Sequence, residues 1–241
     1  LHETWDRFFP NGKYRDANLT FFHEPELLET GGGIKNITDW IKDDPVLVYN
    51  GDIITDFPID RLMTGHMASN NTATLAVQNH GPDLRITVDG HRVTDVRGLI
   101  HQQQGTHQFT GIYVIDPEIL ELIPPNEKIS IIPAFVELIK QGELGAYHVK
   151  GHPKWLDLGT RETYLKASLA IPPKVSREAR ISETANIQNS WVAQNAIVES
   201  GSIIKDSILW PDTHVLQDAE LTNCIVHSNS PTSGVHKSAD L

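Results

Sequence analysis

The chain has little cysteine, a shortage of positive charge and no long apolar run, and each shortage excludes a class of protein. Cys224 is the single cysteine among 241 residues, which excludes an internal disulfide framework and favours a reducing compartment. Acidic residues outnumber basic ones by 31 to 20, and the resulting net charge of −11 argues against non-specific nucleic-acid binding. A phosphorylated substrate stays compatible with this charge, because metal ions and backbone amides can neutralise phosphate.

No apolar run approaches the roughly 20 residues that a membrane-spanning helix needs. No secretory signal is visible at Leu1, so we expect a cytoplasmic protein. The chain opens on a polar stretch with aromatic residues and no methionine, which we interpret as entry in the middle of a domain. The length allows one large domain or two smaller ones.

Short apolar runs alternate with helical periodicities over residues 18–169. The clearest buried strand is Val46–Tyr49, and the Asp89-Gly90 pair between residues 85–88 and 92–96 is typical of a hairpin. We expect the other strands over 18–23, 72–78, 109–115 and 144–150, and helices over 34–41, 59–67, 130–141 and 161–169. This alternation predicts a mainly parallel α/β sheet with a hairpin insertion.

Two aspartates lie beside short apolar segments. Asp52 follows the strand Val46–Tyr49, and Asp157 lies within the segment 154–158. Ligands of open α/β sheets bind at the carboxyl ends of strands, so both aspartates are candidate metal ligands. The alternative for Asp52 is an Asx-type turn, and for Asp157 a carboxylate at the start of a helix capped by Thr160.

Glycines mark two further places where a ligand can approach the backbone. Gly31, Gly32 and Gly33 precede the predicted helix 34–41, and would leave several N–H groups free for a flat ligand. The alternative is a flexible turn. Gly111 lies inside the predicted strand 109–115, where glycine often marks close approach of a ligand or another backbone.

The composition changes at residues 171–173. Beyond them, small residues recur about every six positions with slips to five, and aliphatic residues follow many of them two places later. The small residues are Ala179, Ala185, Ala196, Gly201, Ser207, Thr213 and Ala219. This pattern predicts the hexapeptide coils of a parallel β-helix over residues 175–226, followed by a polar, frayed tail over 227–241.

An α/β domain followed by hexapeptide coils resembles the sugar-1-phosphate nucleotidyltransferases, also called nucleotide-sugar pyrophosphorylases. Four stretches support this resemblance: residues 24–34 (EPELLETGGGI), 49–52 (YNGD), 110–113 (TGIY) and 155–160 (WLDLGT). The Glu-Thr-Gly-Gly-Gly form is most similar to bacterial mannose-1-phosphate guanylyltransferases and N-acetylmuramate-1-phosphate uridylyltransferases. The resemblance implies a Rossmann-like nucleotidyltransferase domain over 1–170 and a short left-handed β-helix over 175–226.

The resemblance also implies a reaction. A sugar 1-phosphate attacks the α-phosphorus of a nucleoside triphosphate, giving a nucleotide-sugar and pyrophosphate. Positioning and charge neutralisation promote such displacements. Mg²⁺ usually takes one or two protein carboxylates, so Asp52 and Asp157 are expected to be the catalytic metal ligands. The nucleobase and the sugar stay open.

Further site residues follow from the resemblance alone. It implies nucleotide binding by Glu29, Thr30, Gly31, Gly32, Gly33, Asn50 and Gly51. It implies sugar binding by Gly111, Glu127, Lys128 and Trp155. A lysine at position 128 departs from some members of the family, and Trp155 is also compatible with a core role.

One part of the family pattern does not occur in this sequence. The family's first strand ends in a glycine-rich loop with an arginine that holds the triphosphate, and a catalytic lysine follows. We therefore expect roughly 60 residues of the domain to be missing, and the chain alone to be a poor catalyst or none. A non-catalytic regulatory or assembly subunit and a hexapeptide acyltransferase, with His214 as its base, stay open as alternatives. Flat coil faces favour a homo-oligomer through residues 175–226.

Overall fold

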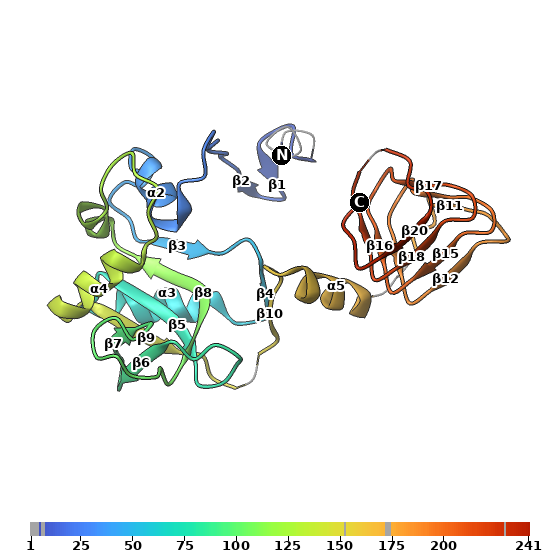
Figure 1. The fold of residues 1–241 in the computed structure, drawn as a ribbon. Helices are drawn as coiled ribbons and strands as arrows, with labels where there is room; N and C mark the ends of the chain where they lie inside the picture. Colours follow the sequence, from blue (N-terminus) through green and yellow to red (C-terminus); the bar gives the residue numbers. More distant parts are fainter. Residues whose placement is uncertain (1–4, 6–7, 152, 172–174, 229) are drawn as a thin grey trace. The chain divides into compact units, whose positions relative to one another are not determined.

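The computed structural model describes residues 5, 8–151, 153–171, 175–228 and 230–241. The chain divides into two compact units (Figure 1). The first contains Leu1–Gly51 and Asp56–Pro153, and the second contains Asp52–Thr55 and Lys154–Leu241. A four-residue piece from the first half of the chain is therefore part of the second unit.

A six-stranded mixed sheet forms the first unit, in the order β3-β8-β5-β9-β7-β6. Its strands are β3 (Val46–Tyr49), β5 (Ala73–Gln78), β6 (Ile86–Asp89), β7 (Arg92–Val96), β8 (Gln108–Ile115) and β9 (Leu144–His148). The Rossmann-like α/β class is confirmed, but the prediction of mainly parallel pairing was wrong. Only β5 and β9 pair in parallel, because β8 inserts between β3 and β5 and runs antiparallel to both. A strand that is buried on both faces has the same apolar pattern whether it runs parallel or antiparallel to its neighbours, so its sequence does not indicate its direction.

The core of this unit forms around β5 and β8. All six residues of β5 are buried, and Tyr113 of β8 packs edge-on against Phe135 with 5.4 Å between ring centroids. Phe135 lies on α4 (Ile132–Gln141), which has proline in its first turn and ends at Gly142 with φ 75°. The helix α3 (Ile59–Met67) and the 3-10 helix η1 (Pro117–Leu122) bury Leu62 and Ile119. None of the described helices is long and apolar enough to cross a bilayer.

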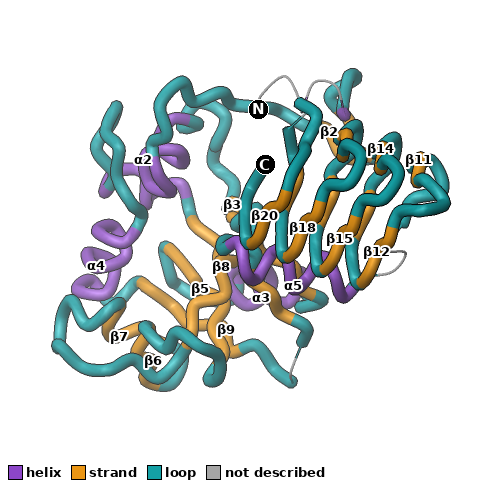
Figure 2. The backbone as a smooth tube through the Cα atoms, turned by 45° about the vertical axis from the view of Figure 1, so that its right-hand side comes forward, coloured by secondary structure: helices purple, strands orange, loops and turns teal. Residues whose placement is uncertain are grey.

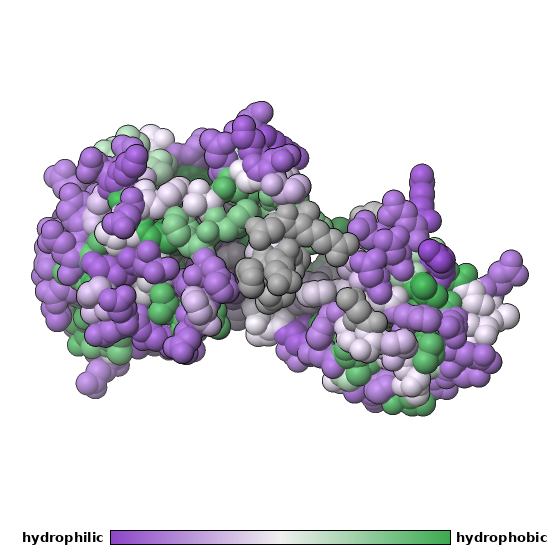
Figure 3. Space-filling model, turned by 90° about the horizontal axis from the view of Figure 1, so that it is seen from above, coloured by the Kyte–Doolittle hydropathy of each residue, from purple (hydrophilic) through white to green (hydrophobic). Residues whose placement is uncertain are grey.

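The predicted hairpin is confirmed as β6 and β7. Asp89 pairs with Arg92 across a two-residue turn, and Gly90 adopts φ 57°, a conformation open to glycine at little cost. The surface seen in Figure 3 is largely hydrophilic on both units, with scattered apolar side chains.

The prediction of a strand over 18–23 was wrong. The strand there is limited to Ala17–Asn18 (β2), which pairs with Lys13–Tyr14 (β1). The aromatic residues that suggested a longer strand lie beside other aromatic rings instead, one stacked and one edge-on. Phe21 lies 6.1 Å from Trp5, and Phe22 lies 6.1 Å from Trp40, measured between ring centroids.

The second unit begins with a strand pair from distant parts of the chain. The strands β4 (Ile53–Thr55) and β10 (Trp155–Asp157) pair antiparallel, with Asp157 opposite Ile53. The helix α5 (Arg161–Ala170) follows, capped by the side chain of Thr160 as predicted. Leu165 of α5 packs against Ile208 and Ile225 of the β-helix.

Three parallel sheets form the faces of the β-helix. They contain β11 (Arg180–Ile181), β14 (Ile197–Val198) and β17 (His214–Val215); β12 (Asn186–Gln188), β15 (Ile203–Lys205), β18 (Glu220–Thr222) and β20 (Val235–Lys237); and β13 (Trp191–Val192), β16 (Ile208–Leu209) and β19 (Ile225–Val226). Figure 2 shows β12, β15, β18 and β20 stacked along one face. From β11 to β19, paired positions of successive coils lie 17 residues apart, which is the sum of two intervals of six residues and one of five. The last pair, β18 with β20, is offset by 15 residues. The hexapeptide prediction is confirmed.

The expectation of a frayed tail was wrong. The strand β20 pairs with β18, and the backbone N–H of Leu241 donates to the carbonyl oxygen of Ile225 at 2.9 Å. The last coil of a parallel β-helix has unpaired backbone N–H and C=O groups. These groups can hydrogen-bond to a polar segment as readily as to an apolar one. The polar composition of the tail therefore did not prevent ordering.

Candidate active site

Asp52 and Asp157 converge at Gly159. The backbone oxygen of Asp52 accepts from the N–H of Leu158 at 2.8 Å, which fixes the end of β10 beside the start of β4. A Cβ atom built on Gly159 would lie 2.9 Å from Oδ2 of Asp52 and 3.0 Å from Oδ1 of Asp157. The distance between the two carboxylate oxygens therefore cannot exceed the sum of these two distances. Glycine leaves the space between them open.

This pair has the donor chemistry that Mg²⁺ prefers. Both side chains are exposed carboxylates, and Oδ1 of Asp157 also accepts from the N–H of Gly159 at 2.8 Å. Within the described ranges, no group of three or more His, Cys, Asp or Glu residues is arranged to hold a metal. Two carboxylates completed by substrate and water fit the usual habit of Mg²⁺, which rarely binds in all-protein cages. Gly159 was not among the predicted site residues, although it lies only two residues after the predicted ligand Asp157.

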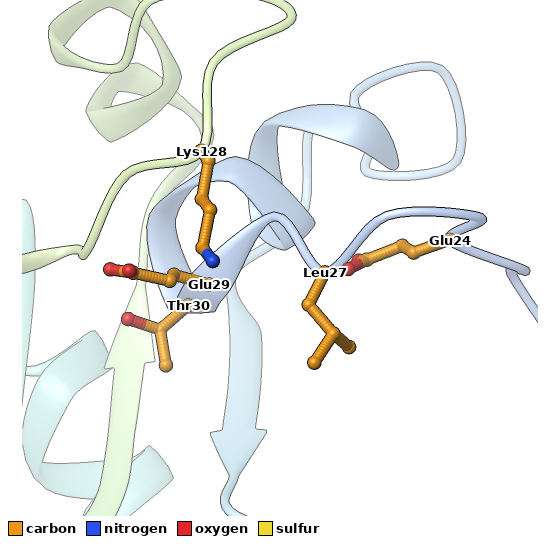
Figure 4. Close-up of a pocket in the computed structure, with 5 residues that line it drawn as sticks. All are labelled: Glu24, Leu27, Glu29, Thr30 and Lys128. Atoms are coloured by element: carbon orange, nitrogen blue, oxygen red, sulfur yellow. The ribbon is translucent and has the colours of Figure 1, made fainter.

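A pocket of about 410 Å³ lies at the start of α2 (Glu29–Asn36). It is lined by Glu24, Leu27, Glu29, Thr30 and Lys128. Figure 4 shows Lys128 reaching toward Glu29 and Thr30, with Leu27 and Glu24 on the other side of the helix start. Its volume is in the usual range for small-molecule sites. Glu24 and Leu27 were not named as site residues, although both lie in the stretch 24–34 that carries the resemblance.

The glycine triplet lies inside α2, and not before a helix that begins at residue 34 as predicted. The N–H groups of Gly31 and Gly32 both donate to the carbonyl oxygen of Ile129 at 2.9 Å. A Cβ on Gly31 would lie 2.7 Å from the carbonyl oxygen of Ser130. The glycines thus let α2 contact the segment 127–131, and the expectation that their amides are free was wrong for Gly31 and Gly32. A direct role in nucleotide binding stays a prediction for the triplet.

Two side chains fix the shape of this pocket. Oε2 of Glu24 accepts from the N–H of Leu28 at 3.0 Å, and Oγ1 of Thr30 accepts from the N–H of Ile131 at 3.1 Å. Glu29 adopts φ 61°, the left-handed region that side chains with a Cβ rarely enter. Such a residue persists where the surroundings fix it, and this commonly occurs at ligand sites.

The structure places Lys128 beside the predicted nucleotide-binding residues Glu29 and Thr30. A Cβ on Gly32 would collide with the carbonyl oxygen of Glu127, the neighbour of Lys128, so this segment is packed tightly against α2. The resemblance had assigned both residues to the sugar. That role stays a prediction, and the geometry offers a second one for Lys128.

The predicted sugar-side residue Gly111 lies at a distortion of the sheet. The N–H of Asn50 donates to the carbonyl oxygen of Gly111 at 3.0 Å, and Gly111 adopts φ 77°. The ladder between β5 and β8 shifts register at this level. Bulges of this kind are common next to active sites. Asn50 and Gly51 thus lie together with Gly111 in the first unit, whereas Trp155 belongs to β10 in the second, half-buried.

Several titratable groups outside these sites are buried or paired with other side chains. The ring of His66 is 2 % exposed and contacts Oδ1 of Asp116 at 3.0 Å and Oγ1 of Thr74 at 2.9 Å. Burial raises the pKa of the Tyr113 hydroxyl. Burial and the neighbouring ring of His148 lower the pKa of His107. In the β-helix, Nε2 of His214 lies 2.8 Å from Oε1 of Glu199.

Comparisons with known proteins identify the family of the chain. The nucleotidyl transferase family model matches residues 2–173, and the model of a GlmU-like C-terminal hexapeptide matches residues 162–233. A mannose-1-phosphate guanylyltransferase from Mycobacterium tuberculosis is 24% identical over 165 residues, covering 66% of this chain and 46% of that protein. A mannose-1-phosphate guanyltransferase from Pichia angusta is 28% identical over 158 residues, covering 62% of this chain and 43% of that protein. The chain thus spans about half the length of the curated relatives it matches.

Solved structures share the fold at low identity. A Bacillus anthracis protein described as a glucose-1-phosphate thymidylyltransferase superposes with a TM-score of 0.58 at 16% identity, over 68% of this chain and 70% of that one. A UDP-glucose pyrophosphorylase from Acinetobacter baumanii gives a TM-score of 0.55 at 16% identity, over 69% of this chain and 66% of that one. The family model covers well over half of the chain, together with its whole α/β region. The chain belongs to the nucleotidyl transferase family.

Proposed function

We propose that the protein containing this chain transfers a nucleotidyl group from a nucleoside triphosphate to a sugar 1-phosphate. An oxygen of the sugar phosphate forms a bond to the α-phosphorus while the bond to pyrophosphate breaks. The observation that supports this proposal best is the convergence of Asp52 and Asp157 at Gly159 in a member of the nucleotidyl transferase family. The relatives named above are described as enzymes of sugar phosphates and nucleotides.

Asp52 and Asp157 would hold Mg²⁺, which when bound supplies positive charge to the phosphate oxygens. The N–H of Gly159 orients Asp157 by donating to its Oδ1, and the other carboxylate oxygen stays available. The pocket at the start of α2 would bind the nucleoside, and the distorted strand at Gly111 would contact the sugar. We expect binding and orientation to provide most of the acceleration, because phosphoryl-type displacements need little covalent chemistry from the protein.

Pyrophosphate release tests the proposal. The chain is assayed alone and joined behind a segment with the family's glycine-rich loop, using a panel of nucleoside triphosphates and sugar phosphates with Mg²⁺. We expect turnover in the extended form, and a loss of about 100-fold or more in Asp52→Asn or Asp157→Asn, because each variant removes charge that stabilises the transition state. Asp60→Asn, an exposed carboxylate on α3, is the matched control.

Two outcomes would contradict the proposal. If both aspartate variants kept wild-type turnover, Asp52 and Asp157 would not be needed for the reaction, and the proposed metal site would be rejected. No turnover by either form with any substrate pair would reject nucleotidyl transfer. If nucleotides still bound in that case, the non-catalytic regulatory subunit would be favoured.

The acyltransferase alternative has one observation in its favour. Nε2 of His214 contacts the carboxylate of Glu199, an arrangement that can orient a histidine base. Acyl-CoA turnover by the chain, lost in His214→Asn, would establish it.

We also propose that the protein is cytoplasmic and forms a homo-oligomer through β-helix faces that α5 does not cover. Light scattering on the purified chain tests the assembly, and a monomer at all concentrations would reject it.

A further inference from the structure

We infer that His91, His107 and His148 of the first unit form a binding site for a zinc ion. The site uses none of the residues proposed for nucleotidyl transfer, so the inference stands independently of that function. It begins from three imidazole rings that the fold brings together from separate parts of the chain.

The three histidines lie where neighbouring segments of the sheet meet. His91 is in the turn between β6 and β7, His107 directly precedes β8, and His148 is the last residue of β9. The strands β9, β7 and β6 are neighbours in the sheet (Figure 1), and His107 forms a β-bridge with Ile86 at the start of β6. A metal ion bound by the three rings would therefore join three separate segments of the sheet.

The spacing of the rings suits a shared metal ion. The ring centroid of His148 lies 5.1 Å from that of His107 and 5.7 Å from that of His91. Two imidazoles bound to one zinc ion at about 2.0–2.1 Å, with tetrahedral angles, have their ring centroids about 5 Å apart. The pair His107 and His148 therefore already has the separation that zinc requires.

The third ligand requires a rotation of one side chain. As the side chains stand, no three His, Cys, Asp or Glu residues of the described ranges are arranged to hold a metal. His91 is exposed, and its ring has no hydrogen bond to another described residue, so its rotation breaks none. Exposed side chains change rotamer within nanoseconds. We expect His107 and His148 to be the stronger ligands and His91 to be the weaker one.

The hydrogen bonds of the closer pair leave one nitrogen of each ring for the metal. Nε2 of His148 lies 2.7 Å from the carbonyl oxygen of Gly90, which only accepts, so Nε2 carries the proton and Nδ1 keeps its lone pair. Nδ1 of His107 contacts Oγ1 of Thr106 at 2.8 Å, which leaves Nε2 for the metal. Metal-binding histidines commonly donate their second ring N–H to a backbone carbonyl, and this bond orients the ring.

Two further properties favour zinc. Burial and the neighbouring ring of His148 lower the pKa of His107, which favours the neutral imidazole that binds metals. Imidazole nitrogens suit zinc, whereas Mg²⁺ prefers oxygen ligands. The histidine site should therefore differ in metal preference from the carboxylates of Asp52 and Asp157. Three protein nitrogens leave the fourth position of the zinc ion to water.

Titration with Zn²⁺ tests the inference. The chain is treated with EDTA, dialysed, and titrated in excess Mg²⁺ with a chromogenic chelator as competitor. We expect one tightly bound zinc ion per chain and a raised melting temperature, because the ion binds the folded state. Binding should weaken as pH falls through the histidine range, because protons compete for the same nitrogens.

Single variants identify the ligands. His107→Gln and His148→Gln should each weaken Zn²⁺ binding by about 30-fold or more, and His91→Gln by about 5-fold, because each removes one of three protein ligands. The matched control is His101→Gln, an exposed histidine in the loop between β7 and β8, which should bind Zn²⁺ as the wild type does.

A second measurement on the wild-type chain keeps the test valid where a variant fails to fold. Zn²⁺ should slow the modification of His91, His107 and His148 by diethyl pyrocarbonate, as mapped by mass spectrometry, and should leave His101 unprotected. Zinc binding of equal strength in the wild type and all three variants would overturn the inference. So would protection of none of the three histidines, or an equal loss of binding in His101→Gln.

Discussion

The same unusual backbone conformation occurs in both units, with different meanings. Asn189, Asp206 and Asn223 in the β-helix adopt positive φ at equivalent corners, 17 residues apart. In the first unit it occurs at residues that do not repeat, among them Glu29, which lines a pocket and enters this region less easily than asparagine or aspartate. Where positive φ recurs once per coil, it belongs to the geometry of the coil. Where positive φ does not recur, as at Glu29, it needs a local cause. Whether a strained conformation repeats along the chain therefore helps to distinguish a structural cause from a functional one.

The corner residues also show how the β-helix reduces this strain. Asparagine and aspartate enter the left-handed region more easily than other side chains. They also bond along the stack: Nδ2 of Asn189 donates to Oδ1 of Asp206 at 2.6 Å, and Nδ2 of Asn223 donates to Oγ of Ser238 at 2.9 Å. Glu29 has no such compensation from the described residues. The comparison leads to three predictions.

The largest effect is expected at Gly159, because the two aspartates of the second unit can lie this close only beside a residue without a side chain. Gly159→Ala would place a methyl group 2.9 Å from Oδ2 of Asp52 and 3.0 Å from Oδ1 of Asp157, and would push the carboxylates apart. We expect pyrophosphate release by the extended form to fall about 100-fold, with little change in thermal stability, since small displacements of reacting groups are costly. Gly65→Ala, within α3, is the control for an added methyl group. Wild-type turnover in Gly159→Ala would contradict the proposed metal pair.

A smaller effect is expected from relieving positive φ in each unit. Glu29→Gly should be more stable than Glu29→Ala by about 1 kcal/mol, because both lack the carboxylate and only alanine keeps the strain. Asp206→Gly and Asp206→Ala should differ by a similar amount, as measured by chemical denaturation. Nucleotide binding should fall only in the Glu29 pair. A loss of binding in the Asp206 pair would show that the two positions do not differ as described.

The smallest effect concerns pH. The pKa of His107 is lowered in the folded chain, first by burial and then by His148, so the unfolded chain binds more protons in mildly acid solution. The stability contributed by neutral His107 is therefore lost as pH falls through the histidine range. His107→Gln should flatten the decline of unfolding free energy between neutral and acid pH. An unchanged slope would show that His107 does not contribute to it.

The sequence predicted features set by neighbours in the chain. The strand Val46–Tyr49, the hairpin at Asp89-Gly90 and the hexapeptide intervals depend on local patterns, and the structure contains all three. Features set by distant contacts were missed. The glycine triplet lies inside α2, where it packs on a segment about a hundred residues further along the chain. No local sequence pattern predicts that contact.

The candidate site shows the same division. The positions of Asp52 and Asp157 at strand ends could be read from the chain, but their meeting at Gly159 depends on the antiparallel pairing of β4 with β10. Lys128 was placed with the sugar because the resemblance supplied a role without a geometry. Its position beside Glu29 follows from how the segment 127–131 contacts α2.

The pairing of β4 with β10 has a consequence for the order of synthesis. Asp52 leaves the ribosome long before Asp157, and the strand that holds it has no partner in the second unit until residues 155–157 have emerged. A truncated product that stops before them would contain the first aspartate of the pair without the second. The two carboxylates can thus act together only after residues 155–157 have been synthesised and β10 has paired with β4 inside the second unit.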